Sequence, residues 1–282
     1  MEIDIQNCVM HGDSEQQLKH VIDESVGLIF TSPPYYNARP QYAQYKNLEE
    51  YLDKMRRVFT ECKRVLGEGR FLVVNSSPVL IPRKDRSHQS TRVHIPFELF
   101  RIIVGLGFDF IEDITWEKPL GAACGRGRGF ARSRMPLTYK AEPNTERIMV
   151  FRKHTDKLID WNIRMQDKES VNNSLVLDDY EKSEVWHISP AHSKKHPAIF
   201  PEKLAEDVIR LYSFKGDMVL DMFAGIGTVG KMALKNGRKF LLIEQNEHYC
   251  EEAIKGLQEL LCKLSAKNNK YFGGYICGVL QK

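Results

Sequence analysis

Short apolar runs alternate with longer amphipathic stretches along the first half of the chain. Residues 26–30 form an apolar run of strand length, residues 70–74 form another after Arg70, and residues 47–66 between them have the periodicity of a helix. Two prolines at 33–34 stop the first run, and Gly67 ends the helix. Strands that alternate with crossover helices predict an α/β fold whose sheet is mostly parallel.

The same pattern continues toward the end of the chain. It predicts helices at about 96–104, 204–212, 228–236 and 246–264, and strands at about 108–116, 146–151, 218–221 and 240–243. Residues 118–134 have no apolar periodicity and are expected to form a surface loop. The weak pattern at 156–193 indicates an irregular insertion, and the tail beyond Lys267 stays unassigned.

Composition excludes a membrane-spanning protein and a wholly disordered chain. The 282 residues are 42% hydrophobic and 28% charged, and no apolar run is long enough to cross a bilayer. The first residues are acidic where a secretory signal needs a basic start, so we expect a cytoplasmic protein. The six cysteines lack the spacing of a metal site or a disulfide framework, so neither is expected.

Positive charge is concentrated in two segments. The net charge is only +4, but residues 118–160 carry ten Lys and Arg against four Asp and Glu. A second basic run contains Arg83, Lys84, Arg86 and Arg92 around Asp85. Lys and Arg clustered in Gly-rich segments are typical of a protein that binds a phosphate backbone, although solvated loops without a ligand remain an alternative.

A Gly-rich turn follows one predicted strand, and an acid ends the next. Asp221 closes the strand at 218–221, Gly225 and Gly227 follow, and Glu244 ends the strand at 240–243. Glycines let the backbone approach a ligand closely at the carboxyl edge of a sheet, and a strand-end acid can accept hydrogen bonds from ribose hydroxyls. The pair therefore predicts a nucleoside cofactor, although such a turn also serves tight packing in other α/β proteins.

The segment Thr31-Ser32-Pro33-Pro34-Tyr35 follows the strand at 26–30. Two consecutive prolines fix the backbone and remove two N–H donors, which leaves carbonyls free to accept hydrogen bonds. With a hydroxyl and an aromatic face beside them, they form a rigid platform suited to a planar group that bears an amine. A simple Pro-Pro turn is the alternative for such a motif in isolation.

Together these motifs resemble the DNA amino-methyltransferases, which move a methyl group from S-adenosylmethionine to an exocyclic amine of adenine or cytosine. The resemblance extends over Gly12-Asp13, Thr31 to Tyr35, Trp116-x-Lys118-Pro119, Thr145-Glu146-Arg147, Trp186, residues 195–201, the Gly-rich turn and Glu244. Thr31 to Tyr35, named the target-base motif from here on, precedes the Gly-rich turn after Asp221, named the cofactor turn. This order is similar to that of the permuted beta class. It implies a Rossmann-like methyltransferase fold with a mostly parallel seven-stranded sheet, circularly permuted motif order and a small target-recognition insertion.

The resemblance assigns roles residue by residue. The target base is expected to be held by Ser32, Pro33, Pro34 and Tyr35. S-adenosylmethionine is expected to be bound by Asp13, Thr31, His196, Pro197, Phe200, Asp221, Phe223, Gly225, Gly227, Thr228 and Glu244. No metal is expected.

Four segments follow from the motif order. Residues 1–117 are expected to form the catalytic part and 194–267 the cofactor-binding part of one methyltransferase domain. Residues 118–193 are expected to form the target-recognition insertion, including a returning strand near 146–151, and 268–282 a tail.

Ser32 favours cytosine as the target. In the family Asp is usual at this position in adenine-N6 enzymes and Ser in cytosine-N4 enzymes, because a carboxylate meets the acceptor edge of cytosine unfavourably. We therefore expect N4 methylation of a flipped-out cytosine in a specific duplex sequence. Adenine-N6 methylation and DNA binding without catalysis remain the alternatives.

Double-stranded DNA is the expected partner. Its contacts are expected from Arg83, Lys84, Arg86, Arg92, Lys118, Arg126, Arg128, Arg132 and Arg134. The resemblance also implies a role as the modification enzyme of a restriction-modification system with a cognate endonuclease. A homodimer is a further expectation, with residues 51–59 of the long helix as its contact.

Overall fold

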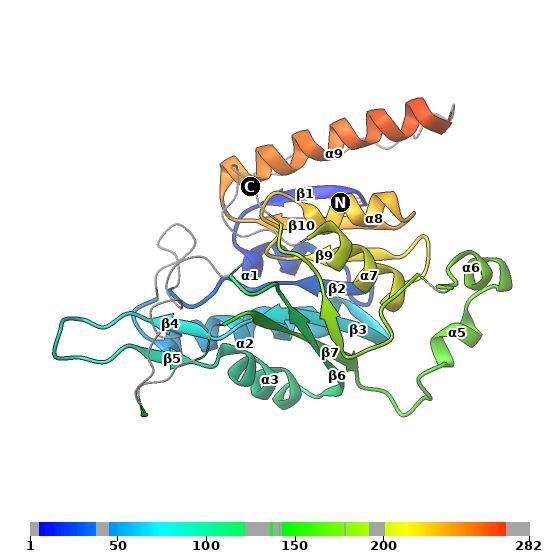
Figure 1. Ribbon diagram of the computed structural model, residues 1–282. Helices are drawn as coiled ribbons and strands as arrows, with labels where there is room; N and C mark the ends of the chain where they lie inside the picture. Colours follow the sequence, from blue (N-terminus) through cyan, green and yellow to red (C-terminus); the bar gives the residue numbers. More distant parts are fainter. Residues whose placement is uncertain are drawn as a thin grey trace.

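A mixed β-sheet between two layers of helices forms the centre of the molecule in a computed structural model (Figure 1). The structure describes residues 6–37, 45–121, 136–137, 141, 143–177, 179–191 and 201–268, with side chains to 265. The strands of this sheet are β1 (Cys8–His11), β2 (Val26–Thr31), β3 (Leu66–Ser76), β6 (Phe108–Glu117), β7 (Thr145–Lys153), β8 (Val185–His187), β9 (Met218–Asp221) and β10 (Lys239–Glu244). The helices are α1 (Ser14–Gln17), the short 3₁₀ helix η1 (Leu18–His20), α2 (Leu48–Val65), α3 (Ile95–Gly105), α5 (Trp161–Met165), α6 (Lys168–Asn173), α7 (Glu202–Tyr212), α8 (Thr228–Lys235) and α9 (Glu247–Asn268).

The strand order β1-β10-β9-β2-β3-β7-β6-β8 confirms the predicted α/β class. Within the described sheet only β7 runs antiparallel to its neighbours, β3 and β6. The sheet has eight strands in this part of the chain rather than the expected seven, because β8 pairs with the end of β6. β8 has three residues, too few to produce a readable apolar pattern.

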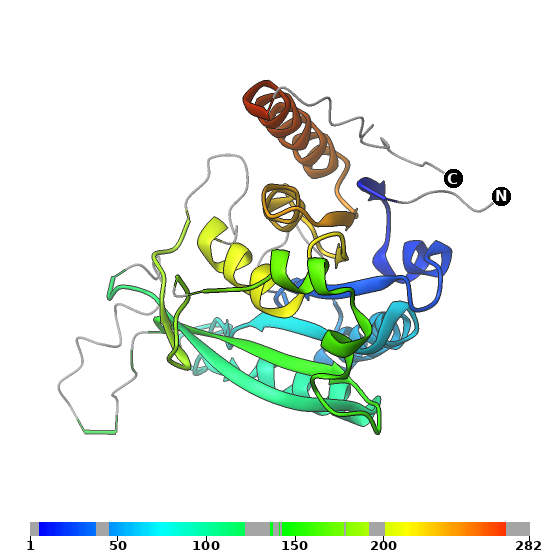
Figure 2. The same ribbon diagram turned by 90° about the vertical axis from the view of Figure 1, so that its right-hand side faces the viewer.

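Helices cover both faces of the sheet (Figure 2). Side chains from α2 and α3 pack on one face, and side chains from α7, α8 and α9 pack on the other. The parallel strands are therefore buried on both sides, which explains their continuous apolar runs. No helix in the described residues is long and apolar enough to cross a membrane.

The apolar side chains of residues 51–59, the range expected to contact a second copy, belong to the core. Asn47 caps α2 by accepting a hydrogen bond from the Glu50 amide at 2.9 Å, and Tyr51, Met55 and Phe59 are fully buried. The apolar stripe of α2 packs on the sheet, as an amphipathic helix does in an α/β fold. The buried residues of this stretch are not available for a dimer contact, whereas Asp53, Arg56 and Arg57 are exposed, and the dimer stays a prediction.

Two segments project from the sheet, one at each end of its strands (Figure 1). The hairpin of β4 (Val79–Ile81) and β5 (Thr91–Val93) follows β3 directly and extends from the carboxyl edge of the parallel strands. The segment with α5 and α6 follows β7 and lies at the other edge. Residues 156–193, expected to be irregular, thus contain α5, α6 and β8.

Candidate functional site

The two sequence motifs meet at the carboxyl edge of the sheet. β2, which ends at Thr31, lies beside β9, which ends at Asp221. The Thr31 hydroxyl donates a hydrogen bond of 2.7 Å to Asp221 Oδ1, and both residues are buried. This hydrogen bond directly joins the target-base motif to the strand that leads into the Gly-rich turn, although the two residues are 190 positions apart in sequence.

Asp221 is a buried carboxyl with few partners. Its Oδ1 also accepts the Phe223 amide at 3.0 Å, and the residue is only 1% exposed. Burial raises the pKa of Asp221 from 3.8 to about 7, the Thr31 and Phe223 hydrogen bonds oppose this shift, and the charge of Glu244 adds to it. Burying an ionisable carboxyl with so few partners lowers the stability of the fold, and such groups are characteristic of functional sites.

The Gly-rich turn is fastened to Glu244. Glu244 Oε2 accepts the Gly225 amide at 2.8 Å, and its Oε1 accepts the Asn246 amide at 2.8 Å. Burial raises the pKa of the Glu244 carboxyl. Gly227 has φ +78°, and a Cβ there would lie 3.1 Å from the Ala253 Cβ, so both backbone shape and space require glycine.

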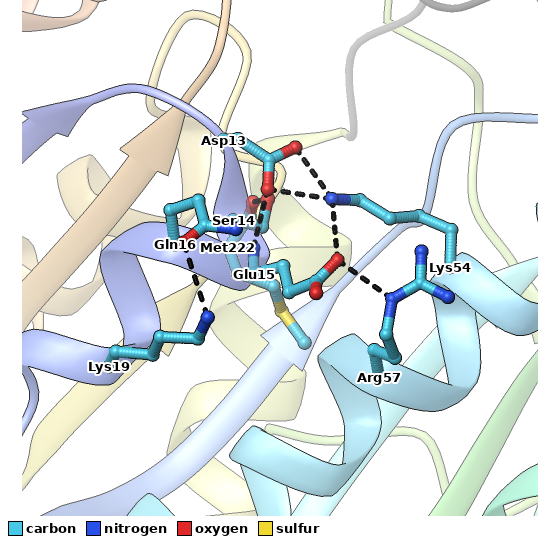
Figure 3. Close-up of polar contacts among 8 residues, drawn as sticks. All are labelled: Asp13, Ser14, Glu15, Gln16, Lys19, Lys54, Arg57 and Met222. Atoms are coloured by element: carbon cyan, nitrogen blue, oxygen red, sulfur yellow. Dashed lines mark hydrogen bonds and ion pairs between the residues drawn. The ribbon is translucent and has the colours of Figure 1, made fainter.

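Asp13 lies on the far side of the same edge, after β1, which pairs with β10 (Figure 3). It caps α1 by accepting the Glu15 amide at 3.1 Å. The Lys54 ammonium, reaching across from α2, binds both Asp13 oxygens at 2.6 and 2.7 Å and Glu15 Oε2 at 3.1 Å. The Ser14 hydroxyl donates to the Met222 carbonyl at 2.6 Å, which joins α1 to the turn after β9.

Tyr35 contacts a buried polar cluster of Glu146 and Asn75, on the side of β2 that faces β3 rather than β9. Its hydroxyl donates to Glu146 Oε2 at 2.7 Å. Burial and the Glu146 charge raise the pKa of Tyr35 well above its ordinary value, while hydrogen bonds from the Ser77 and Ser32 side chains act in the opposite direction. Tyr35 therefore keeps its proton and remains a hydrogen-bond donor at physiological pH.

The rest of the target-base motif borders the same cluster. Pro33 is buried, whereas Ser32 and Pro34 are partly exposed. At the neighbouring end of β3, Asn75 Oδ1 and Ser76 Oγ are buried with no hydrogen-bond partner among the described residues. Unpartnered polar atoms beside a motif of acceptors are suited to a polar, planar ligand.

Acceptor groups dominate this edge and fit a nucleoside cofactor. Asp13, Asp221 and Glu244 supply carboxylate oxygens, each with capacity for more than one donor, which suits ribose hydroxyls and an amine. Phe223 and Thr228, also expected at this site, lie partly exposed beside the turn and at the start of α8. His196, Pro197 and Phe200 lie outside the described residues.

The residues expected to contact DNA fall into three groups. Arg83, Lys84, Arg86 and Arg92 are exposed on the β4–β5 hairpin or the loop at its tip, and Arg92 donates to the Ala141 carbonyl at 3.0 Å. The Lys118 ammonium pairs with Glu146 inside the site, and its contact with DNA stays a prediction. Arg126, Arg128, Arg132 and Arg134 lie outside the described residues.

Three polar residues of the site were not among the predicted site residues: Lys54, Asn75 and Glu146. Glu146 had a readable signal, since it is an acid at the beginning of a predicted strand, two residues before the apolar run 148–151. Lys54 had none, because a lysine on an amphipathic helix is indistinguishable from a solvated one until the helix is placed against Asp13.

Comparisons with known proteins show which family the chain resembles. A family model for the N6/N4 DNA methylases matches residues 26–255. An orphan methyltransferase, M.BamHII of Bacillus amyloliquefaciens, is 29% identical over 259 residues, which cover 86% of this chain and 92% of the relative. The DNA adenine methyltransferase YhdJ of Escherichia coli is 27% identical over 255 residues, which cover 88% and 82%.

Solved structures are also similar. A DNA modification methylase from Thermus thermophilus, in complex with S-adenosyl-L-methionine, has a TM-score of 0.72 and 26% identity over 97% of this chain and 99% of that one. The cytosine-N4-specific PvuII DNA methyltransferase has a TM-score of 0.64 and 23% identity over 89% and 90% of the two chains, a similarity of fold.

Proposed function

The chain belongs to the N6/N4 DNA methylase family, and from this premise we propose that it methylates the exocyclic N4 of a cytosine in duplex DNA. It is a DNA methyltransferase, and its cofactor is S-adenosylmethionine. The observation that carries the proposal is the Thr31–Asp221 hydrogen bond, which brings the target-base motif against the cofactor turn. The proposed identity of the target atom depends on Ser32.

Cofactor binding is proposed for the carboxylates at the sheet edge. Asp221 and the turn at Gly225 and Gly227 would hold the methionine part, Glu244 the ribose, and Asp13 the adenine. S-adenosylmethionine supplies a methyl group activated by a positively charged sulfur. Thr31 fixes Asp221 on the side that faces the target-base motif, so the chain aligns donor and acceptor through adjacent strands.

The target amine is a weak nucleophile, because its lone pair is delocalised into the ring. The Ser32 hydroxyl and the Pro33 carbonyl would accept its hydrogens and direct the lone pair toward the methyl group. Tyr35 would stack on the base. Ser32 brings no charge, so it can face the O2 and N3 acceptors of cytosine, where the Asp that is usual in adenine-N6 enzymes would be repelled.

DNA contacts are proposed for the β4–β5 hairpin and for the basic segment that contains Arg126, Arg128, Arg132 and Arg134. The hairpin projects from the sheet (Figure 1), and its arginines and lysine are exposed. Such charges would grip phosphates while the target base is turned out of the duplex. We also propose that residues 118–193 form the target-recognition part, and that the protein acts in a restriction-modification system with a cognate endonuclease.

Adenine-N6 methylation is the second candidate, because the family and the relative YhdJ include it. Incubation with labelled S-adenosylmethionine and mixed-sequence DNA, followed by digestion to nucleosides, separates the two. Label in N4-methylcytosine is expected. Label in N6-methyladenine would refute the cytosine assignment, and no label would favour a DNA-binding protein without catalysis.

Tyr35→Ala is the matched control for this experiment. Loss of the ring should abolish methyl transfer and leave cofactor affinity nearly unchanged, because Tyr35 lies on the opposite side of β2 from the Gly-rich turn. Label that persists with this variant would come from a contaminating enzyme or would contradict the stacking role.

A further inference from the structure

A buried carboxylate lies directly behind the tyrosine of the target-base motif. Glu146 is 8% exposed, and its Oε2 accepts the Tyr35 hydroxyl at 2.7 Å and the Asn75 amide nitrogen at 2.7 Å. Its Oε1 pairs with the Lys118 ammonium. Donors on both oxygens hold the carboxylate in one orientation, so its position is set before any ligand arrives.

The antiparallel direction of β7 explains why Glu146 reaches this edge. The first residues of β7 lie where β3 and β6 end, with Glu146 opposite Trp116 and Arg147 opposite Ser76. The Lys118 amide donates to the Asn144 carbonyl at 2.8 Å, which extends the ladder past the last residue of β6. Glu146 and Asn75 are therefore carried by strands of the sheet, and Lys118 follows β6 directly.

Lys118 is itself held in place. Its ammonium lies 4.5 Å from the centroid of the Trp116 ring, and its side chain is 18% exposed. The Trp116 indole donates to the Ile188 carbonyl at 2.7 Å, which ties this ring to the segment after β8. The cation that faces Glu146 thus has a fixed aromatic neighbour and little freedom to move toward solvent.

We propose that Glu146 is a positioning residue that orients the Tyr35 ring for the target base, and that Lys118 and Asn75 hold Glu146 for this purpose. The inference rests on the proposed stacking role of Tyr35. The hydroxyl oxygen of a tyrosine lies on the axis of its second rotatable bond, so a hydrogen bond there restricts the turn about the first bond, which swings the whole ring. The ring would then be set in the reactive arrangement without cost when the base enters.

A double-mutant cycle tests the inference. Glu146→Gln, Tyr35→Phe and the double variant are compared with wild type in steady-state methyl transfer, with cofactor affinity measured by calorimetry. Each single change is expected to lower kcat roughly tenfold, because the ring loses its charge-assisted anchor while the binding surfaces persist. The cofactor Kd and the KM for DNA should stay within about twofold.

The double variant decides whether Glu146 acts through Tyr35. If Glu146 acts through the Tyr35 hydroxyl, adding Glu146→Gln to Tyr35→Phe should change kcat by less than about twofold. Multiplication of the two single effects would overturn the inference, as would a kcat for Glu146→Gln equal to that of wild type. A wild type that methylates no DNA would instead overturn the proposed function and this inference with it.

Two further variants control for folding. Glu112→Gln on β6 removes a carboxylate that lies outside the site and accepts a hydrogen bond of 3.3 Å from the Tyr212 hydroxyl. This variant should leave kcat unchanged. Should Glu146→Gln fail to fold, Lys118→Met releases one side of Glu146 and is combined with Tyr35→Phe in the same cycle. A loss of kcat that persists in the Tyr35→Phe background would again overturn the inference.

Discussion

Replacing Asp221 by asparagine should stabilise the free protein and weaken its cofactor binding at the same time. The amide oxygen of asparagine can accept the Thr31 and Phe223 hydrogen bonds that Oδ1 accepts, so the change removes a buried charge and puts an NH2 group in the place of Oδ2. The shift of the Asp221 pKa from 3.8 to about 7 corresponds to about 4 kcal/mol, at about 1.4 kcal/mol per unit.

The sign of the pH dependence follows from proton binding. Between these two pKa values the folded protein keeps a proton that the unfolded chain releases, so the wild type loses stability as pH rises through this range. Above about pH 7 the loss is complete. The advantage of Asp221→Asn should therefore widen by about 2 kcal/mol between about pH 5.5 and about pH 7.5, and then stay constant.

Urea unfolding of both proteins without cofactor, at a series of pH values, measures this difference directly. Asp53→Asn, the same chemical change on the exposed face of α2, is the matched control, and its Kd for S-adenosylmethionine should equal that of the wild type. Calorimetry should show the Kd for S-adenosylmethionine raised about tenfold to hundredfold by Asp221→Asn, because a charged acceptor is removed. A constant gap in stability, or a variant less stable than wild type at about pH 7.5, would refute the reasoning.

Three further changes test other parts of the site. Lys54→Met should lower the free energy of unfolding by about 1–2 kcal/mol, because Asp13 and Glu15 lose the cation they share, whereas exposed Lys19→Met should not; urea denaturation compares them. Gly227→Ala should cost about 1–3 kcal/mol more than Gly216→Ala in thermal unfolding, since both have positive φ but only Gly227 has a close neighbour; equal losses would contradict this packing role. Neutralising the charges at 83, 84 and 86 with glutamine should reduce the slope of log K for DNA against log salt concentration by about 0.9 for each phosphate that is no longer neutralised, measured by fluorescence anisotropy; an unchanged slope would place the DNA elsewhere.

The elements that periodicity predicts best are those that pack on the sheet. The helix expected at 47–66 is α2 at Leu48–Val65, and the strand expected at 26–30 is β2, one residue longer. β1 and β8 were not predicted, because such short strands gain their structure from partners far away in sequence. The β4–β5 hairpin was also missed, because two strands of three residues are too short to show an alternating pattern.

Site residues that belong to local motifs were also predicted better than those whose contacts depend on partners far away in sequence. Residues in motifs, such as Asp221 and Glu244, were predicted to share one sheet edge, and they are joined through the Gly-rich turn. Lys118 was expected to contact phosphate because its neighbours are basic, and its pairing with Glu146 depends on the strand register between β6 and β7. A register is a tertiary property, so no local pattern at 118 could reveal it.

Chain order matters less to this site than sheet order. The target-base motif lies near the beginning of the chain and the cofactor turn near its end, yet β2 and β9 are neighbours and the Thr31 hydroxyl binds Asp221. Because each functional group lies at or just beyond a strand end, its distance to the others is set by the spacing of strands rather than by loop length. Glu146 extends this rule: it comes from the beginning of its strand and reaches the same edge because β7 is antiparallel. A permuted sequence can therefore build the same reactive geometry, provided that the two motifs end adjacent strands.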